Sequence, residues 1–85
     1  MDIPEAKKQC QRFIAEMADN RAPKYDDAGV ARGILADLSR GMPRAKYRRR
    51  LTHWCHTHGS LYQRGVPIAK EICIAVYGRI LPRED

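Results

Sequence analysis

The sequence of 85 residues has no apolar run approaching the ~18 to 20 residues that are needed to cross a membrane. Its start, MDIPEAKKQCQRFIAEM, also lacks the uninterrupted apolar stretch of a secretory signal. We therefore expect a soluble, cytoplasmic protein. With 85 residues, of which 44% are hydrophobic, the chain should form one domain, residues 1–85, with a small core.

Paired cysteines are also missing. Cys10, Cys55 and Cys73 are odd in number and widely spaced, and they include no CxxC pair. This pattern fits reduced and mostly buried thiols better than a disulfide framework.

Signatures of catalysis are weak throughout. Asp26 and Asp27 are adjacent and are better interpreted as helix caps, Ser60 has no evident triad, and no glycine-rich phosphate loop is present. We expect no enzymatic activity and no cofactor.

The segment HWCHTH invites a zinc interpretation, because Cys55 and His58 would share one helix face. It lacks a second ligand pair at zinc-finger spacing, although Cys10 or Cys73 could complete a site. We instead expect no metal, with Trp54 and Cys55 in the core and the neighbouring histidines, His53 and His56, on the surface.

The most informative absence is that of acidic residues between Asp37 and Glu71. Residues 1–37 carry six basic and seven acidic side chains, and residues 71–85 carry two and three, so each end sums to minus one. The formal net charge of +6 therefore arises entirely from the middle, which points to a polyanionic partner. The eight basic residues of this block are Arg40, Arg44, Lys46, Arg48, Arg49, Arg50, Arg64 and Lys70.

Helical periodicity covers the first two thirds of the chain. Asp2, Pro4 and Glu5 form a cap-like start to a first helix, which ends before Pro23. A second helix is expected from the Asp26-Asp27 pair to Gly41, and a third from Pro43 to Gly59. The apolar positions of the three helices are Ala6, Cys10, Phe13, Ile14 and Met17, then Val30, Ala31, Ile34, Leu35 and Leu38, then Tyr47, Leu51, Trp54, Cys55 and His58.

The third predicted helix carries most of the charge. At 100° per residue, Arg44 and Arg48 fall beside each other on one flank of the apolar stripe. Lys46, Arg49 and Arg50 point further toward solvent. Five basic residues within seven positions repel one another without an acidic partner, so we expect this helix to bind a polyanion.

The C-terminal segment is ambiguous, because Ile72, Ile74 and Val76 alternate as in a strand whereas Ile68, Ile72 and Val76 fit a helix. Its β-branched residues favour two short strands. The expected fold is mainly α (α+β), a small helical domain with a short C-terminal β-hairpin.

Some aromatic residues could stack on unpaired bases. Most should be core, but Tyr62 follows a break in a polar stretch with Arg64 alongside. The candidates are Tyr25, Tyr47, Trp54, Tyr62 and Tyr77.

From Lys24 to Leu61 the chain resembles the centre of the FinO/ProQ family of bacterial RNA-binding domains. Gly29-Val30 falls on that family's Gly-Ile pair, Pro43-Arg44 on its Ser-Lys pair, and Tyr47-Arg48 on its Leu-Arg pair. Further matches are Ile34, Leu35, Leu38, Leu51 and Cys55-His56-Thr57, and a looser match to the family's hairpin runs through Glu71, Ile72, Gly78 and Ile80. The chain departs from the family at Tyr25-Asp26, at Ser60-Leu61 and at Cys73-Ile74.

The resemblance implies an RNA chaperone or post-transcriptional regulator that recognises a stem-loop together with a single-stranded 3′ tail. Arg44, Arg48 and Arg49, with Lys46, would contact duplex phosphates. Substitutes for the family's tail-binding residues would be Tyr62, Arg64 and Lys70. Nothing in the sequence fixes an oligomeric state, and we expect a monomer.

Two other classes remain open. A DNA-binding helix-turn-helix regulator would place the third helix in a major groove, after the short turn from Ser39 to Met42. A small inhibitor or adaptor of the kind that phage and plasmid genes encode would instead use the basic face to bind an acidic protein.

Overall fold

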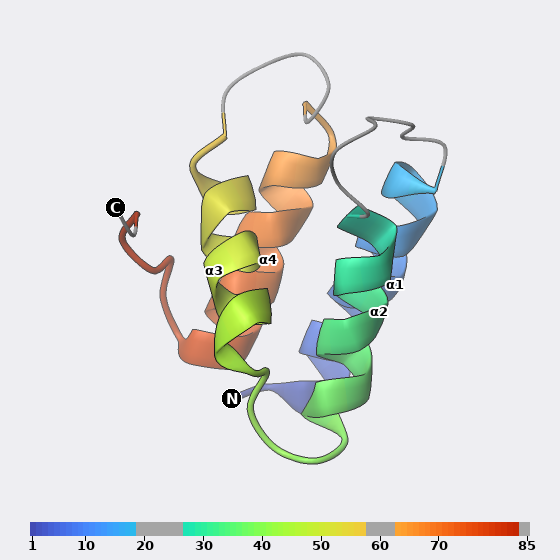
Figure 1. Cartoon of the computed structure of the whole chain (residues 1–85), viewed down its shortest axis with the longest axis vertical. Helices are drawn as coiled ribbons and strands as arrows, with labels where there is room; N and C mark the ends of the chain where they lie inside the picture. The colour runs from blue at the N-terminus through green and yellow to red at the C-terminus, as the bar shows by residue number, and fades with distance from the viewer. Residues whose placement is uncertain (19–26, 58–62, 84–85) are drawn as a thin grey trace.

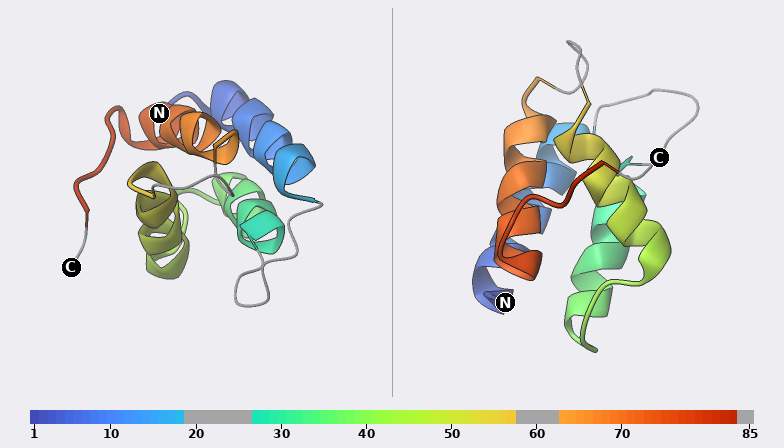
Figure 2. Two further views of the ribbon diagram at one scale, coloured as in Figure 1. Left: turned by 90° about the horizontal axis from the view of Figure 1, so that it is seen from above. Right: turned by 90° about the vertical axis from the view of Figure 1, so that its left-hand side faces the viewer.

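The computed structural model describes residues 1–18, 27–57 and 63–83, and these form four α-helices that run up, down, up and down (Figure 1). Seen along the helices, consecutive helices occupy neighbouring corners of a square, with α1 beside α4 in one layer and α2 beside α3 in the other (Figure 2). The helices are α1 (Ile3–Met17), α2 (Asp27–Leu38), α3 (Ala45–Cys55) and α4 (Gly65–Tyr77).

The capped start of the first helix is confirmed. The Asp2 carboxylate accepts a hydrogen bond from the backbone N–H of Glu5 at 3.1 Å, and Pro4 lies in the first turn, where its missing N–H costs nothing. The inward face of α1 is buried, as its spacing predicted, through Ala6, Gln9, Cys10, Phe13 and Met17.

Helices α2 and α3 also form where the sequence predicted them. Helix α2 ends at Leu38, and the turn that follows includes Gly41 at φ 138°, a backbone conformation that glycine adopts without a Cβ penalty. Pro43 is buried and Arg44 is the N-cap of α3, with extended backbone angles. Of the two aspartates expected to cap α2, Asp27 begins the helix and Asp26 lies outside the described residues.

The predicted C-terminal strands are wrong, because this segment is helix α4 and the described residues contain no strand. Burial on α1 and α3 outweighs the β preference of the branched residues: Ile68, Ile72 and Val76, four apart, all face inward. Ile74, which a strand would have placed with Ile72, is instead 45% exposed. Helix α4 ends at Gly78 in the left-handed conformation. The fold is therefore all-α.

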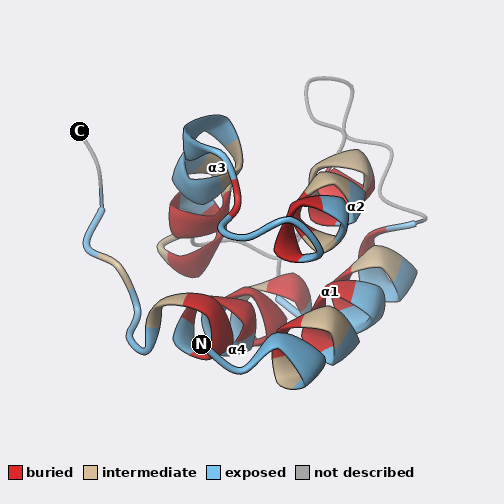
Figure 3. Cartoon of the chain, turned by 90° about the horizontal axis from the view of Figure 1, so that it is seen from below, coloured by how far each residue is buried: buried red, intermediate tan, exposed pale blue. Residues whose placement is uncertain are grey.

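The core lies between the two layers, and the buried faces of the helices point toward it (Figure 3). At its centre the Phe13 ring of α1 stacks on Trp54 of α3, with centroids 4.2 Å apart. The three cysteines are free and buried, as the sequence predicted. None of the described helices is long and apolar enough to span a membrane.

After α4 the chain turns back toward α3 and is held there by two side chains. The ring Nε2 of His56 donates to the carbonyl of Leu81 at 2.8 Å, and the Leu81 N–H donates to the sulfur of Cys73 at 3.4 Å. This strap, residues 78–83, brings Arg83 to the C-terminal end of α3, where it lines one hollow with His53, His56 and Thr57.

Candidate nucleic-acid interface

On its inner side, α3 is tied to α2 by an ion pair. The guanidinium of Arg50 donates twice to Asp27 Oδ1, at 2.8 and 3.2 Å, and the indole N–H of Trp54 donates to the same oxygen at 3.0 Å. The Arg50 and Asp27 side chains are only 17% and 1% exposed. The prediction that Arg50 points to solvent is therefore wrong, since this arginine joins two helices.

At the start of α3, Arg44 is bound to Asp37 at the end of α2. Its backbone N–H, Nε and Nη2 lie 3.1, 3.1 and 3.3 Å from the carboxylate oxygens of Asp37. The Arg44 backbone N–H and then its guanidinium lower the pKa of Asp37. Arg44 remains 54% exposed, but a carboxylate already balances its charge.

Tyr47 packs on α2 at Gly33, where a Cβ would overlap the tyrosine ring. Arg44 and Lys46 lie 5.3 and 5.1 Å from the centroid of this ring, at cation-π distance. Tyr47 therefore packs α3 against α2 and also contacts the charged ends of two cationic side chains. Trp54, another stacking candidate, is fully buried.

The outward face of α3 carries Lys46, Arg49 and His53, all exposed. At 3.6 residues per turn these positions lie within about 60° of one another, and we call them the outer stripe. Figure 3 shows this exposed face of α3 pointing away from the bundle. Arg48 is also exposed and lies on the neighbouring flank, roughly 100° from Arg49.

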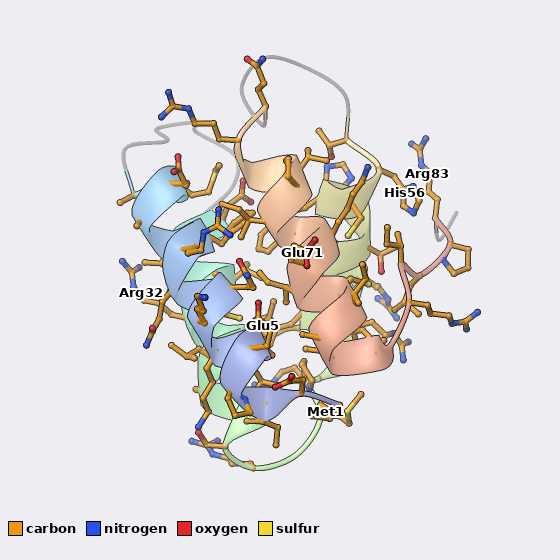
Figure 4. The ribbon with its side chains drawn as sticks, turned by 180° about the vertical axis from the view of Figure 1, so that it is seen from behind. Met1, Glu5, Arg32, His56, Glu71 and Arg83 are labelled. Carbon is orange, nitrogen blue, oxygen red and sulfur yellow. The ribbon has the colours of Figure 1, made fainter. Side chains whose placement is uncertain are left out.

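The outer stripe ends at a polar hollow of about 290 Å³ lined by His53, His56, Thr57 and Arg83. Figure 4 shows His56 and Arg83 together at one edge of the molecule. Burial lowers the pKa of His53, and the charges of Arg50 and Arg83 lower it further, although Asp27 opposes them. At neutral pH the charge of the stripe therefore comes from Lys46 and Arg49.

The other predicted site residues are placed apart from the stripe. Arg64 is 84% exposed and its Nη1 lies 3.9 Å from Glu16 of α1. Lys70 is exposed on α4. A hydrogen bond with Cys73 and burial raise the pKa of Cys55, and the charge of Lys70 acts in the opposite direction. Tyr62 and Tyr25 lie outside the described residues.

Sequence reasoning missed Asp27, Asp37 and Arg83. The spacing of Asp37 to Arg44, across a turn that was itself predicted, could have suggested their pair. Asp27 and Arg50 are 23 residues apart, and no local pattern links them.

Among residues 1–18, 27–57 and 63–83, no group of three or more histidines, cysteines or acidic residues is arranged to hold a metal ion. No protein family, curated protein or solved structure was found to match this chain.

Proposed function

We propose that this protein binds structured RNA, without catalysis, through Lys46, Arg48 and Arg49 on the exposed side of α3. The observation that carries the proposal is how charge is divided around this helix. Buried or partly buried aspartates bind the basic residues that face α2, and the exposed side presents several cations with no acidic residue between Asp37 and Glu71 in the sequence. Such a face releases counterions from phosphates.

RNA is favoured over other polyanions by the resemblance of residues 24–61 to FinO/ProQ domains, which implies recognition of a stem-loop with a 3′ tail. In this proposal the outer stripe and Arg48 contact phosphates of the stem. The polar hollow beside His53 and Arg83 lies at the end of the stripe, where a single-stranded tail leaving the stem would pass. The role of RNA chaperone or regulator follows from the resemblance alone.

The helix-turn-helix alternative rests on α2, its turn and α3. A recognition helix reads bases with its N-terminal residues. Here Arg44 at the N-cap is bound to Asp37 and Tyr47 packs on Gly33, which removes two first-turn side chains from base contact. We therefore rank duplex DNA below RNA and include it as a competitor. An acidic protein partner is the third class, and it predicts no affinity for either nucleic acid.

The test is fluorescence anisotropy at ~150 mM salt, where distant charges are already screened. The probes are a stem-loop RNA with a 3′ oligo-U tail, the same stem without its tail, and a duplex DNA of equal charge. We expect preference for the tailed RNA. Equal affinity for the DNA would favour the helix-turn-helix alternative, and no binding to any probe would favour a protein partner.

The variant that decides the site is Lys46→Ala/Arg49→Ala. Each lost phosphate contact should reduce the slope of log K against log salt by roughly 0.7 to 0.9, so the double variant should lose roughly 1.4 to 1.8. The matched control is Lys8→Ala/Arg32→Ala, which also removes one exposed lysine and one exposed arginine, here from α1 and α2. Arg32 lies at the opposite edge of the molecule from His56 and Arg83 (Figure 4). Equal losses in both variants would mean that net charge alone drives binding.

A further inference from the structure

The side of the molecule away from α3 contains a groove between α1 and α4. Its volume is about 450 Å³, within the size range of ligand pockets in proteins. Figure 4 shows Met1, Glu5 and Glu71 around this region, on the side of the molecule away from α3. We call it the α1/α4 groove, and its lining residues are Met1, Asp2, Glu5, Glu71, Ile74 and Ala75.

The groove combines an exposed apolar floor with a carboxylate rim. Ile74 is 45% exposed and Met1 58%, although both are large apolar side chains. One hydrogen bond closes an end of the groove, because the Asp2 N–H donates to the carbonyl of Ala75 at 2.8 Å and joins the start of α1 to α4. An occupant that fits would therefore place an apolar group against Ile74 and cations beside the rim.

The turn between α2 and α3 has the complementary pattern. Met42 is 51% exposed and is flanked in sequence by Arg40 and Arg44, both exposed. Contacts at both ends hold the turn to α2: the Arg40 N–H donates to the carbonyl of Asp37 at 2.9 Å, and Arg44 is bound to the Asp37 carboxylate. We call the projecting residues, Arg40, Met42 and Arg44, the basic knob.

We propose that the basic knob of one molecule docks into the α1/α4 groove of a second copy. Met42 would pack on Ile74, and Arg40 would approach the carboxylates of Glu5 and Glu71. The two surfaces differ, so the contact is head-to-tail, and it extends into a chain of molecules unless its rotation closes a ring. This self-association goes beyond RNA binding and does not depend on it.

The contact should be weak, since a single side chain in a groove buries far less area than a stable dimer interface. The net charge of +6 also makes distant copies repel one another. At ~150 mM salt that repulsion is screened beyond about 8 Å, whereas contacts at the rim of the groove remain. Association should therefore be visible only at high protein concentration, with a dissociation constant on the order of 100 µM.

Sedimentation velocity of the RNA-free protein at roughly 0.5 mM, well above that constant, tests the proposal. We expect the wild-type protein to sediment faster as its concentration rises. Met42→Ser and Ile74→Ser should each remain monomeric at every concentration. The matched control is Ile80→Ser, because Ile80 is 39% exposed and belongs to neither surface. Circular dichroism melting of each variant establishes that it is folded.

Mixing the two variants separates a head-to-tail contact from a symmetric one. Met42→Ser keeps an intact groove and Ile74→Ser keeps an intact knob, so their equimolar mixture should form dimers but nothing larger. A wild-type protein that stays monomeric at this concentration would overturn the proposal. It would also be overturned if either folded variant still associated alone, or if the mixture of the two stayed monomeric.

Discussion

The two layers of the bundle differ in the contacts that join the two helices within each layer. Helices α1 and α4 approach closely through apolar side chains, and at Gly65 a Cβ would come within 2.5 Å of the Met17 methyl group. Helices α2 and α3 contact each other over a shorter stretch, through the Asp27 ion pair and the Tyr47 ring. The difference teaches that basic residues on one helix can differ in their structural role, because Arg44 and Arg50 join α3 to α2 whereas Lys46 and Arg49 are exposed.

The largest expected effect is a difference in stability between variants of two neighbouring arginines, Arg50 and Arg49. Arg50→Ala should lower the free energy of unfolding by about 3–5 kcal/mol, because it removes both guanidinium hydrogen bonds from the buried Asp27 carboxylate. Arg49→Ala should change stability by about 0.5 kcal/mol or less, since Arg49 is exposed. Urea denaturation of both variants measures the difference. Equal losses would contradict the division of roles on α3.

Gly33→Ala and Gly65→Ala compare the close contacts of the two layers. At Gly33 the new methyl group meets a rigid ring, so overpacking should cost about 1–3 kcal/mol, offset by about 1 kcal/mol of helix propensity. At Gly65 the methyl group meets the flexible end of Met17, which can move aside, and we expect a smaller loss. Thermal melting shows which variant loses more stability, and a larger loss for Gly65→Ala would contradict this prediction.

Asp37→Asn tests the ion pair at the α2–α3 turn, in which the Arg44 side chain is 54% exposed, and should destabilise the protein less than Arg50→Ala. Because contacts with Arg44 lower the pKa of Asp37, its ionised form contributes stability above the unfolded value of about 3.8. That contribution is lost as the pH falls through the lower folded value. The difference in melting temperature between the wild type and Asp37→Asn should therefore be present at pH 6 and shrink below pH ~3.8. A difference that did not change with pH would show that Asp37 acts through packing alone.

The smallest effect concerns His53, whose pKa is lowered by burial and by Arg50 and Arg83. The unfolded chain then binds the proton first as the pH falls through the ordinary histidine value of about 6.5, so acidification should destabilise the wild type. His53→Gln lacks this loss. We expect the free energies of unfolding of the two proteins to differ by about 0.5 kcal/mol or less in their pH dependence. The wild type should become less stable as the pH falls from 7 to the lowered pKa. Parallel curves would place the His53 ring outside the influence of the two arginines.

The sequence predicted three of the four helices because their signals are local. Capping and turn residues influence only the few residues beside them. Such residues are Asp2 and Glu5 at the first helix, and Gly41 and Pro43 between the next two. Helix α4 was missed because its branched residues alternate like those of a strand. The pattern that decides it is the burial of Ile68 and Ile72 against other helices, which is a tertiary effect.

For the candidate site, the sequence located the basic helix but not the use of each side chain. Helical spacing placed Arg44 on a flank of the apolar stripe and grouped Arg50 with Arg49 toward solvent. Only the folded chain brings Asp27 and Asp37 to two of them, and only the strap through Leu81 brings Arg83 near His53. These partners come from other elements, so helical periodicity on α3 alone could not separate structural from exposed charges.

The pairing of α1 with α4 has a consequence for how the chain folds. These helices lie far apart in the sequence, yet they form one of the most extensive contacts and are joined by the hydrogen bond from Asp2 to Ala75. Forming this contact therefore closes most of the chain into a loop, which costs conformational entropy. We expect the contact to offset that cost only when α2 and α3 are also in place. Removing a few residues from either end of the helical region should disrupt the same interface, so the four helices should unfold as one cooperative unit.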